Sequence, residues 1–204
     1  IASILIVLYI VVKKIQIKLT KQSFLWMVLG GIVVAIHWVT FFMAIKVSNV
    51  SIALATLSIG AFFTAILEPI WYGRKIIKYE ILFGLLVIVG LCFIFRVDTS
   101  HLYGMILAAI SAFLAATFSI INGKLVQKEK PSIIAMVELS TGVVFLSIYF
   151  LFTNVFTVDF FQVSIPDWCY LFILASICTA YAFIASVKVM RFLTPYTVML
   201  KTNL

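Results

Sequence analysis

Long apolar runs alternate with short charged segments along the whole chain. A bilayer core about 30 Å thick is crossed by roughly 20 residues of apolar helix, and runs of that length recur between the charged segments. Apolar residues at about 1–12 and 195–204 are predicted to be parts of two further spans, so we expect a fragment of a longer chain. The pattern predicts six complete membrane-spanning helices, at residues 25–45, 50–72, 79–95, 102–122, 132–152 and 168–187.

Composition agrees with a membrane protein and argues against a soluble one. Hydrophobic residues make up 65% of the 204 residues and charged residues 11%, whereas an average soluble domain is about half apolar and a quarter charged. The expected fold class is therefore an all-α, polytopic integral membrane helix bundle whose surroundings are the lipid bilayer. The net charge of +8 predicts no nucleic-acid partner, because the basic residues lie between apolar spans and not on one face of a folded surface.

The 15 Lys and Arg residues fall almost entirely in alternate connections between the spans. Only Lys46 and Arg96 lie in the other set, and cytoplasmic connections are the ones that retain Lys and Arg. A bacterial plasma (inner) membrane is the expected location. The distribution predicts that the basic loops 13–22, 73–78, 123–131 and 188–194 are cytoplasmic and that the loops 46–49, 96–101 and 153–167 are external.

Motifs for covalent chemistry or bound cofactors are missing from the sequence. It contains no metal-ligand cluster, no glycine-rich phosphate loop after a strand and no GxSxG or paired-His spacing. The three cysteines are expected to be small apolar residues and not disulfide partners, since Cys92 and Cys178 lie within spans and only Cys169 lies near the predicted outer face. We expect no enzyme activity, no cofactor and no bound metal.

Small residues spaced four apart predict close helix packing, because they let helix backbones approach one another in lipid. The span 102–122 carries two such rows, and the spans 50–72 and 168–187 carry one each. We therefore expect at least three spans in a close-packed bundle. The rows are Ala108, Ala112 and Ala116; Ser111, Ala115 and Ser119; Thr56, Gly60 and Thr64; and Cys178, Ala182 and Ser186.

A family resemblance begins at residues 37–95, HWVTFFMAIKVSNVSIALATLSIGAFFTAILEPIWYGRKIIKYEILFGLLVIVGLCFIF. This run has an aromatic-rich helix ending in an Ala-x-Lys step, a serine-rich turn, and a helix that closes on a glycine and a basic stretch. In these features it resembles the EamA-type repeat of the drug/metabolite transporter superfamily, whose next helix carries spaced glycines where this chain has Gly84 and Gly90. The segment YGMILAAISAFLAATFSIINGKL, residues 103–125, looks like the opening helix of a second repeat, and LTPYTVML, residues 193–200, like the start of its fourth helix.

The resemblance implies a ten-helix fold made of two inverted five-helix repeats. Residues 1–98 would form the first repeat without its first helix, and residues 99–204 a truncated second repeat. The implied function is a carrier that moves a small metabolite, an amino acid-like solute or a drug across the membrane by alternating access. Many members have Gly-Glu where this chain has Gly73 and Arg74, so no role of that glutamate is carried over. The alternative function is a non-transporting membrane scaffold or sensor.

Ionisable residues within spans are candidates for a substrate pathway, because burying them in a membrane is costly. His37 lies beside Trp38 and close to Thr40, and it either lines a cavity or is satisfied by a neighbouring helix. In a cavity it would be a plausible acceptor for a proton as coupling ion. Glu138, about six residues into its span, either lines the pathway or reaches the cytoplasmic interface. Two further candidates are expected to face the same region as Glu138, namely Asn122 and Tyr181.

Glu68 and Pro69 interrupt the apolar run FFTAILEPIWYGRK at residues 62–75. Pro69 has no N–H, so the carbonyl of Ala65 loses its usual helical partner. In one interpretation the carboxylate and this carbonyl act together as a cytoplasmic gate or part of a cation site. In the other, Glu68 lies at a helix end, reaches the interface and pairs with Arg74 or Lys75.

Overall fold

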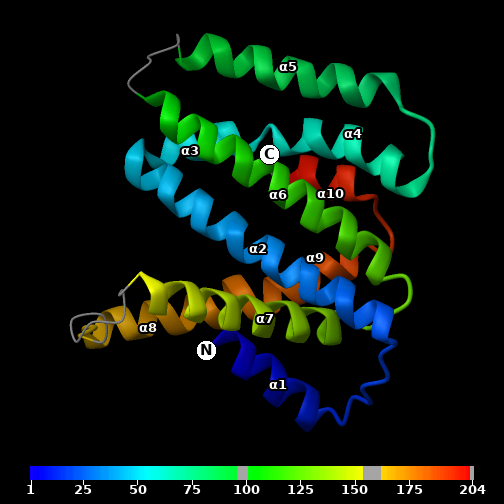
Figure 1. Ribbon diagram of the computed structural model, residues 1–204, viewed down its shortest axis with the longest axis vertical. Coiled ribbons are helices and arrows are strands. Elements are labelled where there is room, and N and C mark those ends of the chain that lie inside the picture. Colours follow the sequence, from blue (N-terminus) through cyan, green and yellow to red (C-terminus); the bar gives the residue numbers. More distant parts are fainter. Residues whose placement is uncertain (96–100, 154–161, 203–204) are drawn as a thin grey trace. The chain divides into compact units, whose positions relative to one another are not determined.

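The computed structural model describes residues 1–95, 101–153 and 162–202, and within these ranges the chain forms helices and no strand (Figure 1). The predicted all-α class is thereby confirmed for the described residues. The elements in chain order are α1 (Ala2–Val12), α2 (Lys21–Val47), α3 (Val50–Leu57), α4 (Gly60–Tyr72), α5 (Lys78–Phe95), α6 (Leu102–Leu125), α7 (Pro131–Phe152), α8 (Ile165–Ile173), the π-helix η3 (Leu174–Tyr181), α9 (Ala182–Val189) and α10 (Pro195–Thr202).

Five stretches of the described residues are long and apolar enough to cross a membrane, and each coincides with one of the six predicted complete spans. The sixth prediction, residues 79–95, coincides with α5, a helix of 18 residues. These helices suit an integral membrane bundle, while the inverted repeat, the membrane and the orientation stay predictions. The five stretches are Lys21–Val47, Val50–Tyr72, Leu102–Leu125, Pro131–Phe152 and Ile165–Val189.

Several helices extend further than the apolar pattern predicted. Both ends of α2 and the C-terminal end of α6 lie within connections that were expected to be loops. Lys46 and Lys124 lie in the last turns of these helices, where a cation interacts favourably with the C-terminal end of the helix dipole. The predicted loops 13–22, 46–49 and 123–131 are therefore partly helical. Most of the loops predicted at 96–101 and 153–167 lies outside the described residues.

Capping side chains and special backbone conformations set several helix ends. The Asn49 side chain accepts a hydrogen bond of 2.9 Å from the Ile52 N–H and caps the start of α3. Gly73 ends α4 with a φ of +68°, a left-handed conformation that glycine adopts without strain. Pro131 occupies the first turn of α7. A backbone N–H at this position has no partner within the helix, so proline's lack of an N–H costs no helical hydrogen bond.

The span Val50–Tyr72 is not one regular helix, because a tight turn at Ser58 and Ile59 divides it into α3 and α4. The φ and ψ angles of Ser58 are −61° and −19°, which are close to 3₁₀-helix values. The Ser58 hydroxyl also donates a hydrogen bond of 2.6 Å to the carbonyl of Ala55. A side chain that competes for a backbone carbonyl in this way favours a break in the helix.

The span Ile165–Val189 is also irregular, since η3 separates α8 from α9. Within η3 the Thr179 hydroxyl donates a hydrogen bond of 2.9 Å to the carbonyl of Leu174, five residues earlier. This spacing matches the i to i+5 pattern of a π-helix. The hydropathy pattern carries no signal for either irregularity, because both segments remain apolar.

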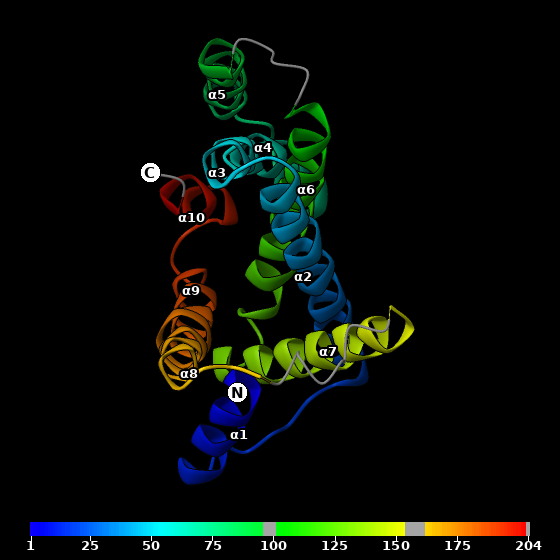
Figure 2. The same cartoon turned by 90° about the vertical axis from the view of Figure 1, so that its left-hand side faces the viewer.

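Contacts divide the chain into two compact units. Unit 1 consists of residues 1–35 and 124–191, and unit 2 of residues 36–123 and 192–204. In unit 1, α1 packs against α7 and η3, and α7 packs against α9 (Figure 2). In unit 2, α4 packs against both α5 and α10. Each unit combines segments of both predicted repeats, and the repeats themselves stay a prediction.

Small residues form much of the buried interior, as predicted for three of the four rows. Ala108, Ala112, Ala116 and Ser111 of α6 are each fully buried, and Thr56, Gly60 and Thr64 are buried as well. The prediction is wrong for the row at Cys178, because Cys178 and Ala182 are exposed. The row lies on the exposed side of the span Ile165–Val189, of which few residues are buried.

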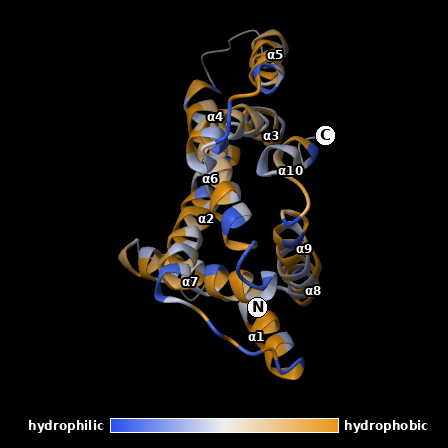
Figure 3. Ribbon diagram, turned by 90° about the vertical axis from the view of Figure 1, so that its right-hand side faces the viewer, coloured by the Kyte–Doolittle hydropathy of each residue, from blue (hydrophilic) through white to orange (hydrophobic). Residues whose placement is uncertain are grey.

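The outer surface is apolar along the helices, and hydrophilic residues gather in connections such as those between α1 and α2 and between α4 and α5 (Figure 3). Phe93, Phe152 and Phe192 are examples of large apolar side chains that are almost entirely exposed. Such a surface is unfavourable in water and favourable in hydrocarbon. This distribution supports the interpretation of the chain as a membrane protein.

The orientation is testable by labelling single cysteines in a background without the three native cysteines, all of which are exposed. Gln162 and Lys128 are exposed positions in two different connections. We expect Gln162→Cys to react with an impermeant maleimide in intact cells, and Lys128→Cys to react only after permeabilisation, because basic connections stay in the cytoplasm. The opposite pattern would reverse the orientation, and labelling of both from one side would contradict the topology.

Candidate functional site

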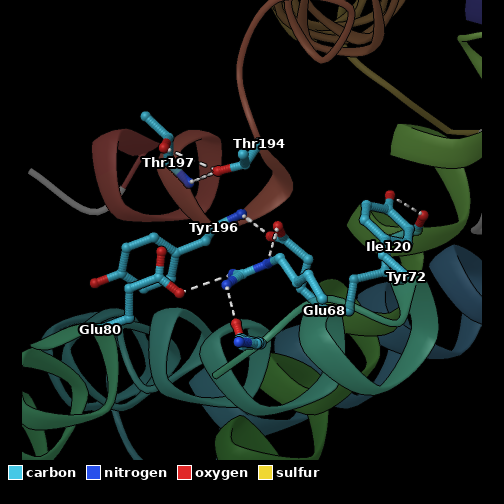
Figure 4. A network of polar contacts seen from close by, with 9 residues as sticks. Glu68, Tyr72, Glu80, Ile120, Thr194, Tyr196 and Thr197 are labelled. Carbon is cyan, nitrogen blue, oxygen red and sulfur yellow. Dashed lines mark hydrogen bonds and ion pairs between the residues drawn. The ribbon is translucent and has the colours of Figure 1, made fainter. Parts of the chain in front are cut away.

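A polar cluster in unit 2 surrounds Glu68, in the C-terminal part of α4 (Figure 4). Glu68 Oε1 accepts a hydrogen bond from Nε of Arg74 at 3.0 Å. On its other side, the Arg74 guanidinium donates from Nη2 to Oε2 of Glu80 at 2.8 Å. Glu68 Oε2 accepts from the backbone N–H of Tyr196 at 2.8 Å. We call Glu68, Arg74, Glu80 and the Tyr196 N–H the Glu68 network.

Local structure explains how these groups meet. Gly73 turns the chain at the end of α4, so Arg74 can reach back to the carboxylate six residues earlier. Glu80 lies in the first turn of α5, and Tyr196 lies in the first turn of α10, where α10 packs on α4. Both carboxylates therefore lie at helix N-termini, where unpaired N–H groups and the helix dipole favour negative charge.

The start of α10 is held by two different acceptors. Glu68 accepts from the Tyr196 N–H, and the Thr194 hydroxyl accepts from the Thr197 N–H at 3.2 Å (Figure 4). The Tyr196 side chain is buried against Ala61 and Ala65 of α4. The carboxylate of Glu68 thus acts as a helix cap supplied by a distant part of the sequence.

Charge balance in the Glu68 network depends on Arg74. The side chains of Glu68 and Glu80 are 1% and 8% exposed, and that of Arg74 is 23% exposed. Burial by itself would lower the pKa of the Arg74 guanidinium, but its hydrogen bond to Glu80 and the charge of Glu68 raise that pKa above its ordinary value. Arg74 is therefore the fixed positive charge between two buried carboxylates.

The structure decides part of the question raised by Glu68 and Pro69. The predicted pairing with Arg74 is confirmed, but the carboxylate is buried and does not lie exposed at a helix end as that interpretation supposed. α4 also continues through Pro69 as far as Tyr72.

The sequence interpretation missed Glu80, although its place at a helix start near Arg74 was a usable signal. It also missed Tyr196, whose contribution is a backbone N–H and has no sequence signal.

A second contact region in unit 2 joins the ends of α4 and α6 to the start of α10. The Tyr72 hydroxyl donates a hydrogen bond of 2.8 Å to the carbonyl of Ile120. A Cβ atom at Gly123 would lie 2.7 Å from Cγ of Pro195 and closer still to the Tyr72 hydroxyl oxygen. Gly123 is therefore required for the close approach of these three segments.

His37 contacts a neighbouring helix through one of its ring nitrogens, as one of its two predicted interpretations supposed. Its Nδ1 lies 2.9 Å from the carbonyl oxygen of Ser111 and 2.8 Å from the Ser111 hydroxyl, both on α6. Trp38 is half-buried on the same helix. The Thr40 hydroxyl donates to carbonyls of its own helix, at 2.9 Å to Ile36. A role of Trp38 and Thr40 in a pathway stays a prediction.

Glu138 lies in unit 1 and is fully buried within α7. A Cβ atom at Gly30 would overlap its carboxylate, and one at Gly31 would overlap the backbone of Glu138 and the side chain of Thr141. Two successive glycines of α2 thus make room for this residue. Glu138 does not reach an exposed interface in this unit, so that alternative is wrong.

The last two predicted site residues have very different environments. Asn122 is fully buried and donates a hydrogen bond of 3.2 Å to the carbonyl of Phe118 in its own helix. Tyr181 is 72% exposed at the end of η3. Asn122 belongs to unit 2, and Glu138 and Tyr181 belong to unit 1. Their predicted common region stays a prediction.

Among the described residues, no group of three or more His, Cys, Asp or Glu side chains is placed to hold a metal ion. Within the Glu68 network, the carboxylates of Glu68 and Glu80 are both paired with Arg74. The sequence matches no protein-family model, no curated protein and no solved structure. The resemblance to the EamA-type repeat therefore stays a prediction.

Replacing Arg74 tests how far the Glu68 network stabilises unit 2. Arg74→Ala leaves two buried carboxylates without their counter-charge, and we expect the free energy of unfolding to fall by about 3 kcal/mol. Lys75→Ala removes the adjacent, exposed cation and should change it by less than about 0.5 kcal/mol. Denaturant unfolding of the purified protein in detergent measures both. Adding Glu68→Gln to Arg74→Ala should recover part of the loss, and equal stability of Arg74→Ala and Lys75→Ala would contradict the assignment.

Gly123→Ala tests the contact region at Tyr72 and Pro195. We expect a loss of about 1 to 3 kcal/mol in the free energy of unfolding, because the added methyl forces the three helix ends apart. Gly90→Ala is the matched control, since a Cβ at Gly90 meets nothing within 4 Å and alanine favours helix by up to about 1 kcal/mol. Thermal unfolding followed by circular dichroism compares the two variants, and equal transitions would refute the close approach at Gly123.

Proposed function

We propose that the protein is a carrier of the EamA type, which moves a small metabolite, an amino acid-like solute or a drug across a bacterial inner membrane by alternating access. The burial of Glu138 carries this proposal. An ionisable residue enclosed between apolar spanning helices is costly, and such residues are by default candidates for substrate or ion pathways. Here the two glycines Gly30 and Gly31 accommodate a carboxylate where an apolar side chain would satisfy packing alone.

The irregular helices support the same proposal. Carriers commonly build their binding regions from discontinuous spanning helices, and both 3₁₀ turns and π-helical segments within helices are frequent at functional positions. Unit 2 contains the turn at Ser58 and Ile59, and unit 1 contains η3. An inert scaffold has no need for such interruptions in its spans. The resemblance of residues 37–95 to the EamA-type repeat adds the expected class of solute.

The experiment has two steps, because the solute must first be found. Uptake and export of amino acids, other metabolites and drugs are screened in cells that lack related carriers. Flux of the solute so identified is then measured with purified protein in liposomes. We expect Glu138→Gln, which keeps the shape and removes the charge, to lower flux by about tenfold or more, equivalent to about 1.4 kcal/mol on the barrier.

Glu129→Gln is the matched control, since Glu129 lies in the connection between α6 and α7 outside the helices. It should leave flux unchanged, and both variants should give the parental amount of folded protein. Equal flux in Glu138→Gln and the parent would remove Glu138 from the pathway. No flux of any solute class from the folded parent would instead favour the scaffold or sensor.

A further inference from the structure

The contacts of His37 with Ser111 specify which ring nitrogen carries the hydrogen. Nδ1 of His37 lies 2.9 Å from the Ser111 carbonyl oxygen, which can only accept a hydrogen bond. The Ser111 hydroxyl lies 2.8 Å from the same nitrogen and donates to the carbonyl of His37 at 3.1 Å. All three contacts are favourable only if Nδ1 is protonated and the single hydroxyl hydrogen points to the His37 carbonyl.

This assignment leaves the lone pair of neutral His37 on Nε2. A hydrogen bond at one ring nitrogen determines the tautomer and so leaves the other nitrogen as the base. Among the described residues, Nε2 has no hydrogen-bond partner. Protein atoms also do not enclose Nε2 completely. Nε2 therefore keeps an available lone pair and some exposed surface. The ring contacts Ser111 through Nδ1 and stacks with Phe41, at 6.1 Å between ring centroids.

The surroundings of the ring are electrically neutral. The groups against it, Phe41 of α2 and Ser111 of α6, do not titrate, and neither of the two ion pairs of Arg74 includes His37. The charged residues of α2 and α6 are lysines in the terminal turns, and Lys46 is nine residues or about 13 Å from His37 along the helix. α3 has no ionisable side chain, and Glu68 of α4 is paired with Arg74.

We propose that Nε2 of His37 is the proton-binding site of this protein and that the coupling ion of the proposed carrier is a proton. Binding forms one N–H bond from the Nε2 lone pair and a proton of the aqueous phase, and no other bond of the ring changes. The Nδ1–H bond to Ser111 persists in both states. Protonation therefore adds a positive charge to a neutral part of unit 2 without releasing the contact between α2 and α6. The coupling part of the proposal rests on the proposed function, whereas proton binding at Nε2 does not.

Nitrogen NMR of histidine-labelled protein in lipid tests the binding site without any solute. The chain contains only two histidines, and the signals missing from His37→Gln assign His37. At about pH 8 we expect protonated Nδ1 and unprotonated Nε2, and on acidification to about pH 5 we expect Nε2 to gain a proton. The opposite tautomer, or an Nε2 that stays unprotonated over this range, would overturn the proposal.

Coupling is tested in liposomes with the solute identified by screening. We expect His37→Gln to lower the ratio of flux driven by a pH gradient to exchange flux at equal pH on both sides. His101→Gln, the same change at the other histidine, should retain the response to the gradient. An unchanged ratio in His37→Gln would overturn proton coupling at His37. If no solute is transported, the proposed function fails and the NMR titration still decides whether Nε2 binds a proton.

Discussion

The placement of a positive charge between two buried carboxylates is the interaction on which the rest of unit 2 depends. Glu68 and Glu80 lie on different helices, and each would be very unfavourable in an apolar bundle without a counter-charge. The guanidinium of Arg74 contacts both because its planar, forked donor groups point in several directions at once. The connection between α4 and α5 is thereby fixed, and with it the surface on which α10 packs.

The same rule accounts for several other polar side chains of the described helices. A polar group that is removed from water must be hydrogen-bonded or paired within the protein. Nδ1 of His37 is hydrogen-bonded to a residue of another helix, and the hydroxyls of Thr40 and Thr64 donate hydrogen bonds to carbonyls of their own helices. Asn122 makes the same kind of local bond. Small residues such as Ala108, Ala112 and Ala116 are buried alongside these polar groups.

The sequence predicted the helices well and the site only in part. The positions of the spans follow from length and hydropathy, because the thickness of a bilayer limits the possible answers. The turn at Ser58 and the π-helix η3 were not predicted, since both depend on local hydrogen bonding within segments whose hydropathy is uniform. The ion pair of Glu68 with Arg74 was predictable because the two residues are neighbours along the chain. The fully buried state of Glu138 was not, because it depends on Gly30 and Gly31, more than a hundred positions away.

The hydrogen bond between Glu68 and the Tyr196 N–H spans 128 positions in the sequence, and this separation has a consequence for biosynthesis. Arg74 leaves the ribosome almost together with Glu68, so the counter-charge of this carboxylate is available early. The N–H of Tyr196 that donates to the second oxygen of Glu68 exists only after the start of α10 has been synthesised. Over that interval the oxygen is a docking point for an unpaired helix N-terminus. The late synthesis of α10 thus adds a hydrogen bond to a cluster whose ion pairs join neighbouring segments of the chain.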